Sequence, residues 1–366
     1  MIQPLPYVEK ISPYVPGKPV KELERELGIS SCVKLASNEN PLGPSPKAVA
    51  AIQEFLSGSE ELCRYPEGSG YYLKAALQNK LSAGGIAVGF DNLILGNGSN
   101  ELLNIATRTY MSPGDEAVMS QMSFVVYSMA VQAVGGVAHQ VPMTNYRHDL
   151  AAMADAITPK TKMVFVANPN NPTGTTSTAG EFERFMQRVP ENVLVVVDEA
   201  YIEYVSRQDY PDTLKYFAAG RDILLLRTFS KAYGLASLRI GYGIAKPEII
   251  TAINRLREPF NTNTLAQVAA EAAVADDEHV RNTLVNNAAG KQYLMKELAA
   301  LELPGVPSEA NFIFVPISMD SMSLYDGLLR KGVIIRPIGP KAIRISIGTP
   351  HENERFIAAL KEILAA

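Results

Sequence analysis

Runs of hydrophobic residues alternate with amphipathic segments through the middle of the chain. The apolar runs lie at 93–95, 163–167, 193–197, 223–226 and 240–245, and two glycines interrupt the last of them. Between the second and third runs, a helical face is indicated by the i, i+3, i+4, i+7 spacing of Phe182, Phe185, Met186 and Val189. Continuous apolar strands that alternate with amphipathic helices are typical of a sheet buried on both faces. We therefore predict an α/β fold whose mostly parallel sheet is flanked by helices.

The pattern changes after residue 262. A long helical stretch runs towards Leu301, and shorter elements follow it, with strands at 311–315, 333–336 and 343–347 and helices at 324–329 and at the C-terminus. These elements predict a smaller α+β domain. We place the large domain at 45–262, and we assign 1–44 and 263–366 to an N-terminal arm plus the small C-terminal domain. The arm is rich in proline, and we expect one short helix in it, at 20–27, that Gly28 ends.

Composition and charge narrow the class of protein. The chain has 366 residues, of which 47% are hydrophobic and 20% charged, so it can bury a large core in two or more domains. The formal net charge of −4 argues against nucleic acid as a partner. The two cysteines cannot form a disulfide framework. The first 17 residues lack the apolar core of a signal peptide, and glycines and polar residues interrupt the one long uncharged stretch, 117–146. We expect a cytoplasmic protein with no membrane contact.

Polar residues directly follow four of the apolar runs. The segments that follow them are Gly96–Asn100, Asn168–Gly174, Asp198–Tyr201 and Arg227–Lys231. Because ligands of open α/β sheets bind at the carboxyl ends of the strands, these segments are the candidates for a functional site.

Each segment alone leaves two interpretations open. Two glycines before a helix suit an anion, but the third glycine of a dinucleotide fingerprint is replaced by Glu101, and a plain turn remains the alternative. The segment 168–174 can be a long turn, and Asp198 can cap a helix. Burial would lower the pKa of Lys231 and suit it to form a Schiff base, whereas a surface lysine would form an ion pair.

Together the four segments contain what pyridoxal phosphate needs from a protein. They offer an amine, an acid for the pyridine nitrogen, a phenol and an amide for the ring hydroxyl, and an anion cradle. Arg239 adds a cation for the phosphate. The sequence contains no comparable set for other chemistries. It has no P-loop motif for a nucleotidase and no G-x-S-x-G elbow for a serine hydrolase, and its four scattered histidines include no pair at metal-ligand spacing.

The ordered motifs resemble those of the aspartate-aminotransferase superfamily, which has pyridoxal-phosphate fold type I. The motifs that carry this resemblance are 168–174, 198–201, 230–235 and 239–241. More narrowly, the chain is similar to the histidinol-phosphate aminotransferases at 37–41, 64–67, 96–100, 257–261 and 343–348. The resemblance covers essentially the whole chain, and it implies the fold, the cofactor and the roles of single residues.

By this resemblance, Lys231 binds the cofactor covalently and later moves the substrate's proton, and Asp198 pairs with the pyridine nitrogen. The residues implied in holding the rest of the cofactor are Tyr201 and Asn171 at the ring hydroxyl, Phe124 on the ring face, and Ser99, Asn100, Ser230 and Arg239 at the phosphate. Tyr65 is implied to reach the phosphate of the partner subunit, so we expect a homodimer with shared active sites. The residues implied in substrate binding are Tyr14, Arg336 and Arg344.

The resemblance implies transamination of L-histidinol phosphate with 2-oxoglutarate, a step of histidine biosynthesis. Three alternatives stay open: an aromatic amino-acid aminotransferase, a phosphothreonine-type pyridoxal-phosphate decarboxylase, and a non-catalytic relative that keeps the fold. The complete set of Lys231, Asp198 and Tyr201 argues against the last.

Overall fold

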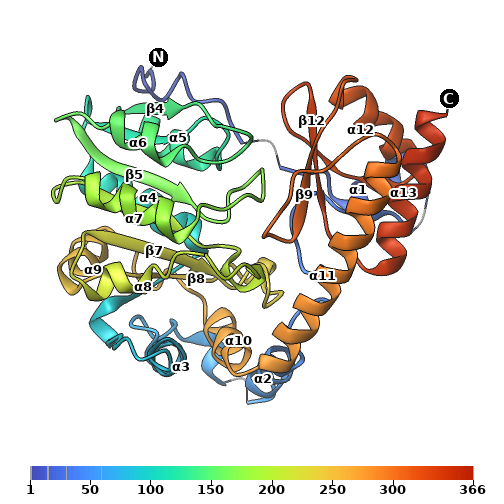
Figure 1. The fold of residues 1–366 in the computed structure, drawn as a ribbon. Coiled ribbons are helices and arrows are strands. Elements are labelled where there is room, and N and C mark those ends of the chain that lie inside the picture. Colours follow the sequence, from blue (N-terminus) through green and yellow to red (C-terminus); the bar gives the residue numbers. More distant parts are fainter. Residues whose placement is uncertain (1, 15, 30, 59, 366) are drawn as a thin grey trace.

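The computed structural model describes residues 2–14, 16–29, 31–58 and 60–365, and it has two parts that a long helix joins (Figure 1). The larger part is built on one sheet, and the smaller part is built on another. The joining helix is α11 (Asp277–Ala300), which starts beside α2 and α10 and runs into the smaller part.

The larger sheet has seven strands within the described residues, in the order β2-β8-β7-β6-β5-β3-β4. Their bounds are β2 (Leu93–Gly96), β3 (Glu116–Ser120), β4 (Val137–Val141), β5 (Thr161–Ala167), β6 (Leu194–Asp198), β7 (Ile223–Thr228) and β8 (Gly241–Ile244). Strand β8 is antiparallel to both of its neighbours, and the other pairs are parallel. The predicted mostly parallel sheet is confirmed, although the sequence did not single out β3 and β4 as strands.

Both faces of this sheet are apolar because its strands lack alternation with polar residues. In β6, Val195 and Val197 belong to one core cluster, and Leu194 and Val196 belong to the other. The first face is covered by α2 (Pro46–Ser57), α3 (Tyr71–Ser82), α6 (Leu150–Asp155), α7 (Ala179–Arg188), α8 (Leu214–Ala218) and α10 (Thr264–Val274). The second face is covered by α4 (Ser99–Tyr110), α5 (Val126–Ala133) and α9 (Pro247–Asn254). The sheet is therefore buried as expected.

The smaller part contains an antiparallel sheet with the order β11-β12-β9. Its elements are β9 (Phe312–Pro316), β11 (Arg336–Pro337), β12 (Ala342–Ser346), α12 (Ser321–Arg330) and α13 (Pro350–Leu364). The single strand predicted at 333–336 is wrong. The chain instead forms β10 (Val333–Ile334), which pairs in parallel with β1 (Val33–Lys34), and then β11, which pairs with β12. Ile335 is buried between the two short strands.

The N-terminal segment contacts both parts. Helix α1 (Val20–Leu27) ends where Gly28 takes a left-handed conformation with φ 64°, as predicted. Strand β1 belongs to the smaller part through β10, whereas Tyr7 lies against Gly135 of the larger part. The domain bounds stay a prediction, and α10, which begins after the predicted boundary at residue 262, packs against α2 and α3.

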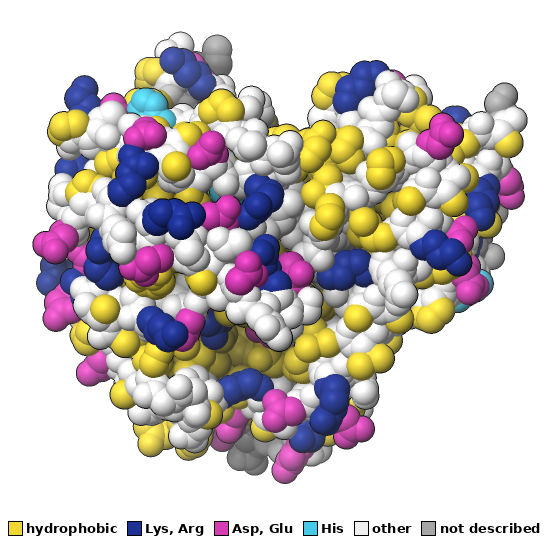
Figure 2. Space-filling view, viewed as in Figure 1, with side chains coloured by type: hydrophobic (Ala, Val, Ile, Leu, Met, Phe, Trp, Pro, Cys, Tyr) yellow, Lys and Arg dark blue, Asp and Glu magenta, His cyan; other side chains and the backbone are white. Residues whose placement is uncertain are grey.

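Short 3₁₀ helices complete the described structure. Their bounds are η1 (Glu60–Cys63), η2 (Phe90–Asn92), η3 (Ile202–Tyr204) and η4 (Ala236–Leu238). In the view of Figure 2, charged side chains of both signs are spread over the larger part, and hydrophobic side chains gather where the two parts meet. Of the helices in the described ranges, none combines the length and apolar character needed to span a bilayer.

Candidate active site

The four polar segments that follow the apolar runs lie at one edge of the larger sheet. Because β8 is antiparallel to both β2 and β7, those two strands point the same way, and Gly96 and Thr228 both pair with Gly241. Asp198, the last residue of β6, pairs with Ala167 of β5. The carboxyl ends of β2, β5, β6 and β7 therefore meet, and the structure brings together the segments that the sequence singled out.

Lys231 lies just after β7, partly buried and beside the boundary with the smaller part. Its Nζ donates a hydrogen bond to the Ser37 carbonyl oxygen at 3.1 Å and lies 5.8 Å from the centre of the Tyr201 ring. Burial and, next, the positive charge of Arg344 lower the pKa of Lys231 to about 8. A fraction of this amine is therefore neutral near pH 7, which is what a nucleophilic lysine requires.

Asp198 is a buried carboxylate held by two hydrogen bonds. The Tyr127 hydroxyl donates to Oδ2 at 2.7 Å, and the Ala200 N–H donates to Oδ1 at 3.2 Å. Burial raises the pKa of Asp198, and these two hydrogen bonds act against that rise. Tyr127 itself is fully buried and stacks on Phe165 with ring centres 5.1 Å apart. The sequence analysis missed Tyr127, because a tyrosine within an apolar helix carries no signal of its partner.

Tyr201 is buried directly after β6. Its hydroxyl accepts a hydrogen bond from Asn38 Nδ2 at 2.9 Å, and its ring meets the edge of Phe312 at 5.1 Å. Burial raises the pKa of Tyr201 to about 12, so its phenol keeps its proton at neutral pH. Asn38 is a second residue that the sequence analysis did not single out. It lies in the segment 37–41, which was noted only as part of the resemblance.

An anion cradle forms at the N-terminus of α4, where Ser99 and Asn100 begin the helix. Gly98 precedes them with φ 76°, and a Cβ atom there would come within 2.5 Å of a guanidinium nitrogen of Arg239. Arg239 Nη1 also donates to Ser230 Oγ at 3.3 Å. The Oδ1 atom of Asn100 is buried without a hydrogen-bond partner in the described structure. A helix N-terminus faced by a guanidinium group suits a phosphate.

Two arginines of the smaller sheet face each other beside this edge. Arg336 on β11 and Arg344 on β12 are paired in register. Arg344 is buried, and it donates from Nη1 to Asn171 Oδ1 at 2.5 Å and from Nη2 to the Ala36 carbonyl at 2.7 Å. The Arg336 guanidinium lies 5.6 Å from the centre of the Tyr14 ring. Like charges on opposed residues destabilise a sheet, so this pair suits a bound anion.

The remaining two predicted residues lie differently. Phe124 is partly buried and meets Tyr127 edge-on with ring centres 5.8 Å apart. Tyr65 is 81% exposed, and its ring stacks on Phe260 at 4.6 Å. Within the described part of this one chain, Tyr65 makes no hydrogen bond or ring contact with Lys231.

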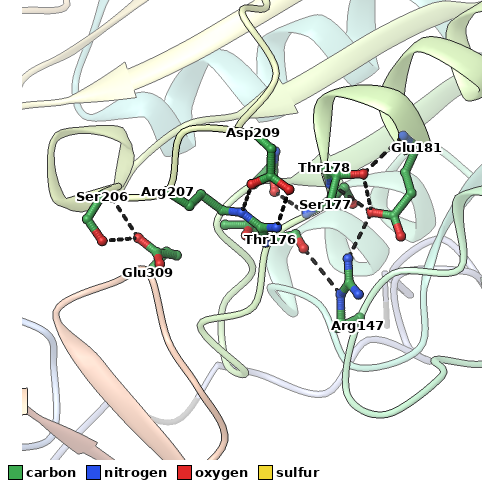
Figure 3. Close-up of polar contacts among 10 residues, drawn as sticks. Arg147, Thr176, Ser177, Thr178, Glu181, Ser206, Arg207, Asp209 and Glu309 are labelled. Atoms are coloured by element: carbon green, nitrogen blue, oxygen red, sulfur yellow. Dashed lines mark hydrogen bonds and ion pairs between the residues drawn. The ribbon is translucent and has the colours of Figure 1, made fainter.

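The loop that carries Asn171 is held by polar contacts on both sides. Asn170 accepts from Ser123 Oγ at 3.0 Å and donates to the Met122 carbonyl at 2.8 Å. Farther along the loop, Figure 3 shows Thr176 between Arg147 and Arg207. Arg147 Nε donates to the Thr176 carbonyl oxygen at 3.3 Å, and Arg207 Nη1 donates to Thr176 Oγ1 at 2.8 Å.

The same loop is tied to the smaller part. The Glu309 N–H donates to the Gly174 carbonyl at 2.8 Å, and the Glu309 carboxylate accepts from Ser206 (Figure 3). The position of Asn171 is thereby fixed relative to both parts, and so is the carboxamide oxygen that binds Arg344.

Comparison with known proteins places this arrangement in a family. The family described as aminotransferase class I and II matches residues 30–360. The chain is 54% identical to a histidinol-phosphate aminotransferase of Moorella thermoacetica over 360 residues, which cover 97% of this chain and 91% of that protein. It is 50% identical to histidinol-phosphate aminotransferase 2 of Pseudomonas fluorescens Pf0-1, with 98% and 97% covered.

Solved structures have the same fold. The histidinol-phosphate aminotransferase of Sinorhizobium meliloti, crystallised with pyridoxal 5′-phosphate, superposes with a TM-score of 0.89 at 30% identity and covers 98% of this chain and 97% of its own. A double mutant of Thermus thermophilus aspartate aminotransferase superposes with a TM-score of 0.85 at 24% identity over the whole of both chains. The resemblance inferred from the motifs is confirmed: this chain belongs to the class I and II aminotransferases and has the aspartate-aminotransferase fold.

Proposed function

We propose that this protein transfers the amino group of L-histidinol phosphate to 2-oxoglutarate, with pyridoxal 5′-phosphate as cofactor, in histidine biosynthesis. The observation that carries the proposal is the in-register pair of Arg336 and Arg344, of which Arg344 lies close enough to Lys231 for its charge to lower the pKa of that amine. The names of relatives about half identical to this chain support it.

The residues at the sheet edge fit pyridoxal phosphate. The cofactor carries an aldehyde, a pyridine nitrogen and a phosphate, and the site offers the Lys231 amine, the buried Asp198 carboxylate and the cradle before α4. The absence of a side chain at Gly98, where a Cβ atom would come within 2.5 Å of Arg239, keeps open the space between that guanidinium group and the start of α4. When bound, pyridoxal phosphate supplies an electron-withdrawing ring that stabilises the charge left when the α-hydrogen departs.

The side chains divide the work by their chemistry. Lys231 forms the covalent link and carries the proton, because its lowered pKa leaves part of the amine neutral. Asp198 keeps a proton on the pyridine nitrogen through charge attraction in a buried setting. The other residues proposed to hold the cofactor are Tyr201 and Asn171 at the ring hydroxyl, Phe124 on the ring face, and Ser99, Asn100, Ser230 and Arg239 at the phosphate.

Substrate choice follows from the two arginines and Tyr14. A phosphate monoester carries close to two negative charges, and planar guanidinium groups match its oxygens. Two arginines also suit the two carboxylates of 2-oxoglutarate, so one anion site can serve both half-reactions. An aromatic amino acid has a single carboxylate and can engage only one of them fully.

We also propose a homodimer in which Tyr65 reaches the phosphate site of the other subunit. Its exposed ring, held on Phe260 rather than in the core, supports this role. Cys32 and Cys63, which form no disulfide, support a cytoplasmic location.

Steady-state kinetics of Arg336→Ala test the function, with Arg330→Ala as the control, since Arg330 is an exposed arginine at the end of α12. Removing Arg336 should lower kcat/KM for L-histidinol phosphate and 2-oxoglutarate by roughly tenfold to a hundredfold, which corresponds to one lost charged hydrogen bond of about 1.5–3 kcal/mol. The loss on phenylalanine should be smaller. A wild-type enzyme that prefers phenylalanine would refute the proposed substrate.

A further inference from the structure

A chain of buried hydrogen bonds joins strand β12 of the smaller sheet to Tyr201. The backbone N–H of Asn38 donates to Ser346 Oγ at 2.8 Å, and Ser346 Oγ in turn donates to Asn38 Oδ1 at 3.0 Å. Asn38 Nδ2 donates to the Tyr201 hydroxyl at 2.9 Å. These three residues are exposed by 4% or less, so water does not compete for these hydrogen bonds.

The direction of every hydrogen bond in this chain follows from its first member. A backbone N–H can only donate, so Ser346 Oγ must accept from Asn38. The hydroxyl hydrogen of Ser346 then needs an acceptor, and within the described structure Asn38 Oδ1 accepts it. Once Oδ1 faces Ser346, the amide nitrogen of Asn38 must face Tyr201, where it can only donate.

We propose that Asn38 is a positioning residue that fixes the Tyr201 hydroxyl as a donor aimed into the cofactor site. Because the phenol oxygen already accepts from Asn38, its own hydrogen is left for another acceptor. This inference rests on the proposed pyridoxal-phosphate chemistry, in which that acceptor is the oxygen on the cofactor ring.

The backbone explains why asparagine suits this position. Asn38 has φ 56°, a left-handed conformation that asparagine, aspartate and glycine tolerate best. Its carbonyl oxygen accepts from Asn311 Nδ2 at 3.0 Å, which holds the turn from the other side. An asparagine here therefore combines a tolerated backbone conformation with a side chain that accepts on one side and donates on the other.

The orientation of the Tyr201 hydroxyl would change the pH at which the cofactor, once linked to Lys231, loses its proton. A hydrogen bond donated by Tyr201 stabilises the negative form of the ring oxygen, and it thereby lowers the pH at which the lysine-bound cofactor gives up its proton. A residue that merely filled space at position 38 would leave that pH unchanged.

Asn38→Asp tests the proposal, because aspartate keeps the shape and tolerates the backbone but, when ionised, only accepts. Tyr201 would then donate to position 38 and turn away from the cofactor. We expect the cofactor-free protein to bind added pyridoxal phosphate about tenfold more weakly. In an absorbance titration of the loaded protein, the transition should move up by about one pH unit.

The double variant Asn38→Asp/Tyr201→Phe separates hydrogen bonding from the added charge. A carboxylate raises the transition pH electrostatically even without the phenol, whereas the contribution that passes through Tyr201 must vanish in the phenylalanine background. A shift of equal size in both backgrounds would overturn the proposal. Should the aspartate variant not fold, Asn38→Gly replaces it, and a smaller upward shift that also depends on Tyr201 is expected.

The outcome for Asn38 can be told apart from the outcome for the proposed function. A wild type that binds pyridoxal phosphate but does not transaminate histidinol phosphate refutes the substrate, and the titration of Asn38→Asp still decides the role of Asn38. A wild type that does not bind pyridoxal phosphate refutes both.

Discussion

Replacing Tyr127 by phenylalanine removes one hydroxyl group from behind Asp198 and nothing else. The ring can stay stacked on Phe165, since the hydroxyl takes no part in that contact. The hydroxyl donates a hydrogen bond to Asp198 Oδ2 at 2.7 Å. Burial raises the pKa of Asp198, and this hydrogen bond lowers it. A hydrogen bond to a charged group contributes about 1.5–3 kcal/mol, which corresponds to roughly one to two pKa units. The pKa of Asp198 should therefore rise in Tyr127→Phe.

The pH dependence of kcat/KM measures this rise. Asp198 acts as a carboxylate, so a higher pKa moves the acid limb of the profile to higher pH and lowers activity most on that side. The matched control is Tyr216→Phe, which also removes a tyrosine hydroxyl that donates to a carboxylate, the one of Glu183 at 2.6 Å, away from the site. Coincident acid limbs for Tyr127→Phe, the control and the wild type would refute the role given to Tyr127.

Three further changes test the rest of the site. Asp198→Asn should abolish most transamination while circular dichroism stays unchanged, and near-normal turnover would show that another group protonates the ring. Lys231→Met should raise the free energy of unfolding of the cofactor-free protein below about pH 8, because the lowered pKa of Lys231 makes its charged form unfavourable in the folded state. This stabilisation should fade as the pH rises towards 10.5. Denaturant titrations at several pH values measure it, and a stabilisation independent of pH contradicts the burial argument. Mixing Lys231→Ala and Tyr65→Phe subunits should restore activity, because a mixed dimer has one site with neither defect, whereas heterodimers without activity would show that Tyr65 does not cross the interface.

The central strands could be predicted from the sequence because helices cover both faces of the sheet. Every residue of such a strand is apolar, whichever strands lie beside it. Residues 193–197 are all apolar, as expected of a strand that is buried between two layers of helices. Strand β4 shows the limit. It lies at the edge of the sheet, and its five residues include His139 and Gln140, so its pattern resembles a loop as much as a strand.

The prediction of one strand at 333–336 was wrong for a different reason. Its apolar residues do indicate an extended chain, but they cannot say which neighbour each half will pair with. Val333 and Ile334 pair with β1, some 300 residues earlier in the chain, while Arg336 pairs with Arg344. Pairing depends on the tertiary structure, and a local pattern does not contain it.

The same limit decided which site residues could be found. The strand-end rule led to Lys231 and Asp198, since each follows its own apolar run. Asn38 and Tyr127 act through partners 163 and 71 residues away, and neither stands next to a pattern that marks a strand end. A buried polar network of this kind becomes visible only when its donors and acceptors are brought together.

The arrangement of Arg344 and Arg336 is energetically unfavourable for the folded chain by itself. Burial first, and then the neighbouring positive charge of Arg336, lower the pKa of Arg344, while its Nε atom stays buried without a hydrogen-bond partner in the described structure. Each of these features is unfavourable in the protein alone. In the proposed function, an anion that binds beside the two guanidinium groups offsets part of these costs, so the binding free energy of the substrate compensates for a cost that the folded chain already carries. Such a site is expected to discriminate by charge, because a ligand with one carboxylate would relieve less of the repulsion between the two guanidinium groups than a phosphate monoester or a dicarboxylate.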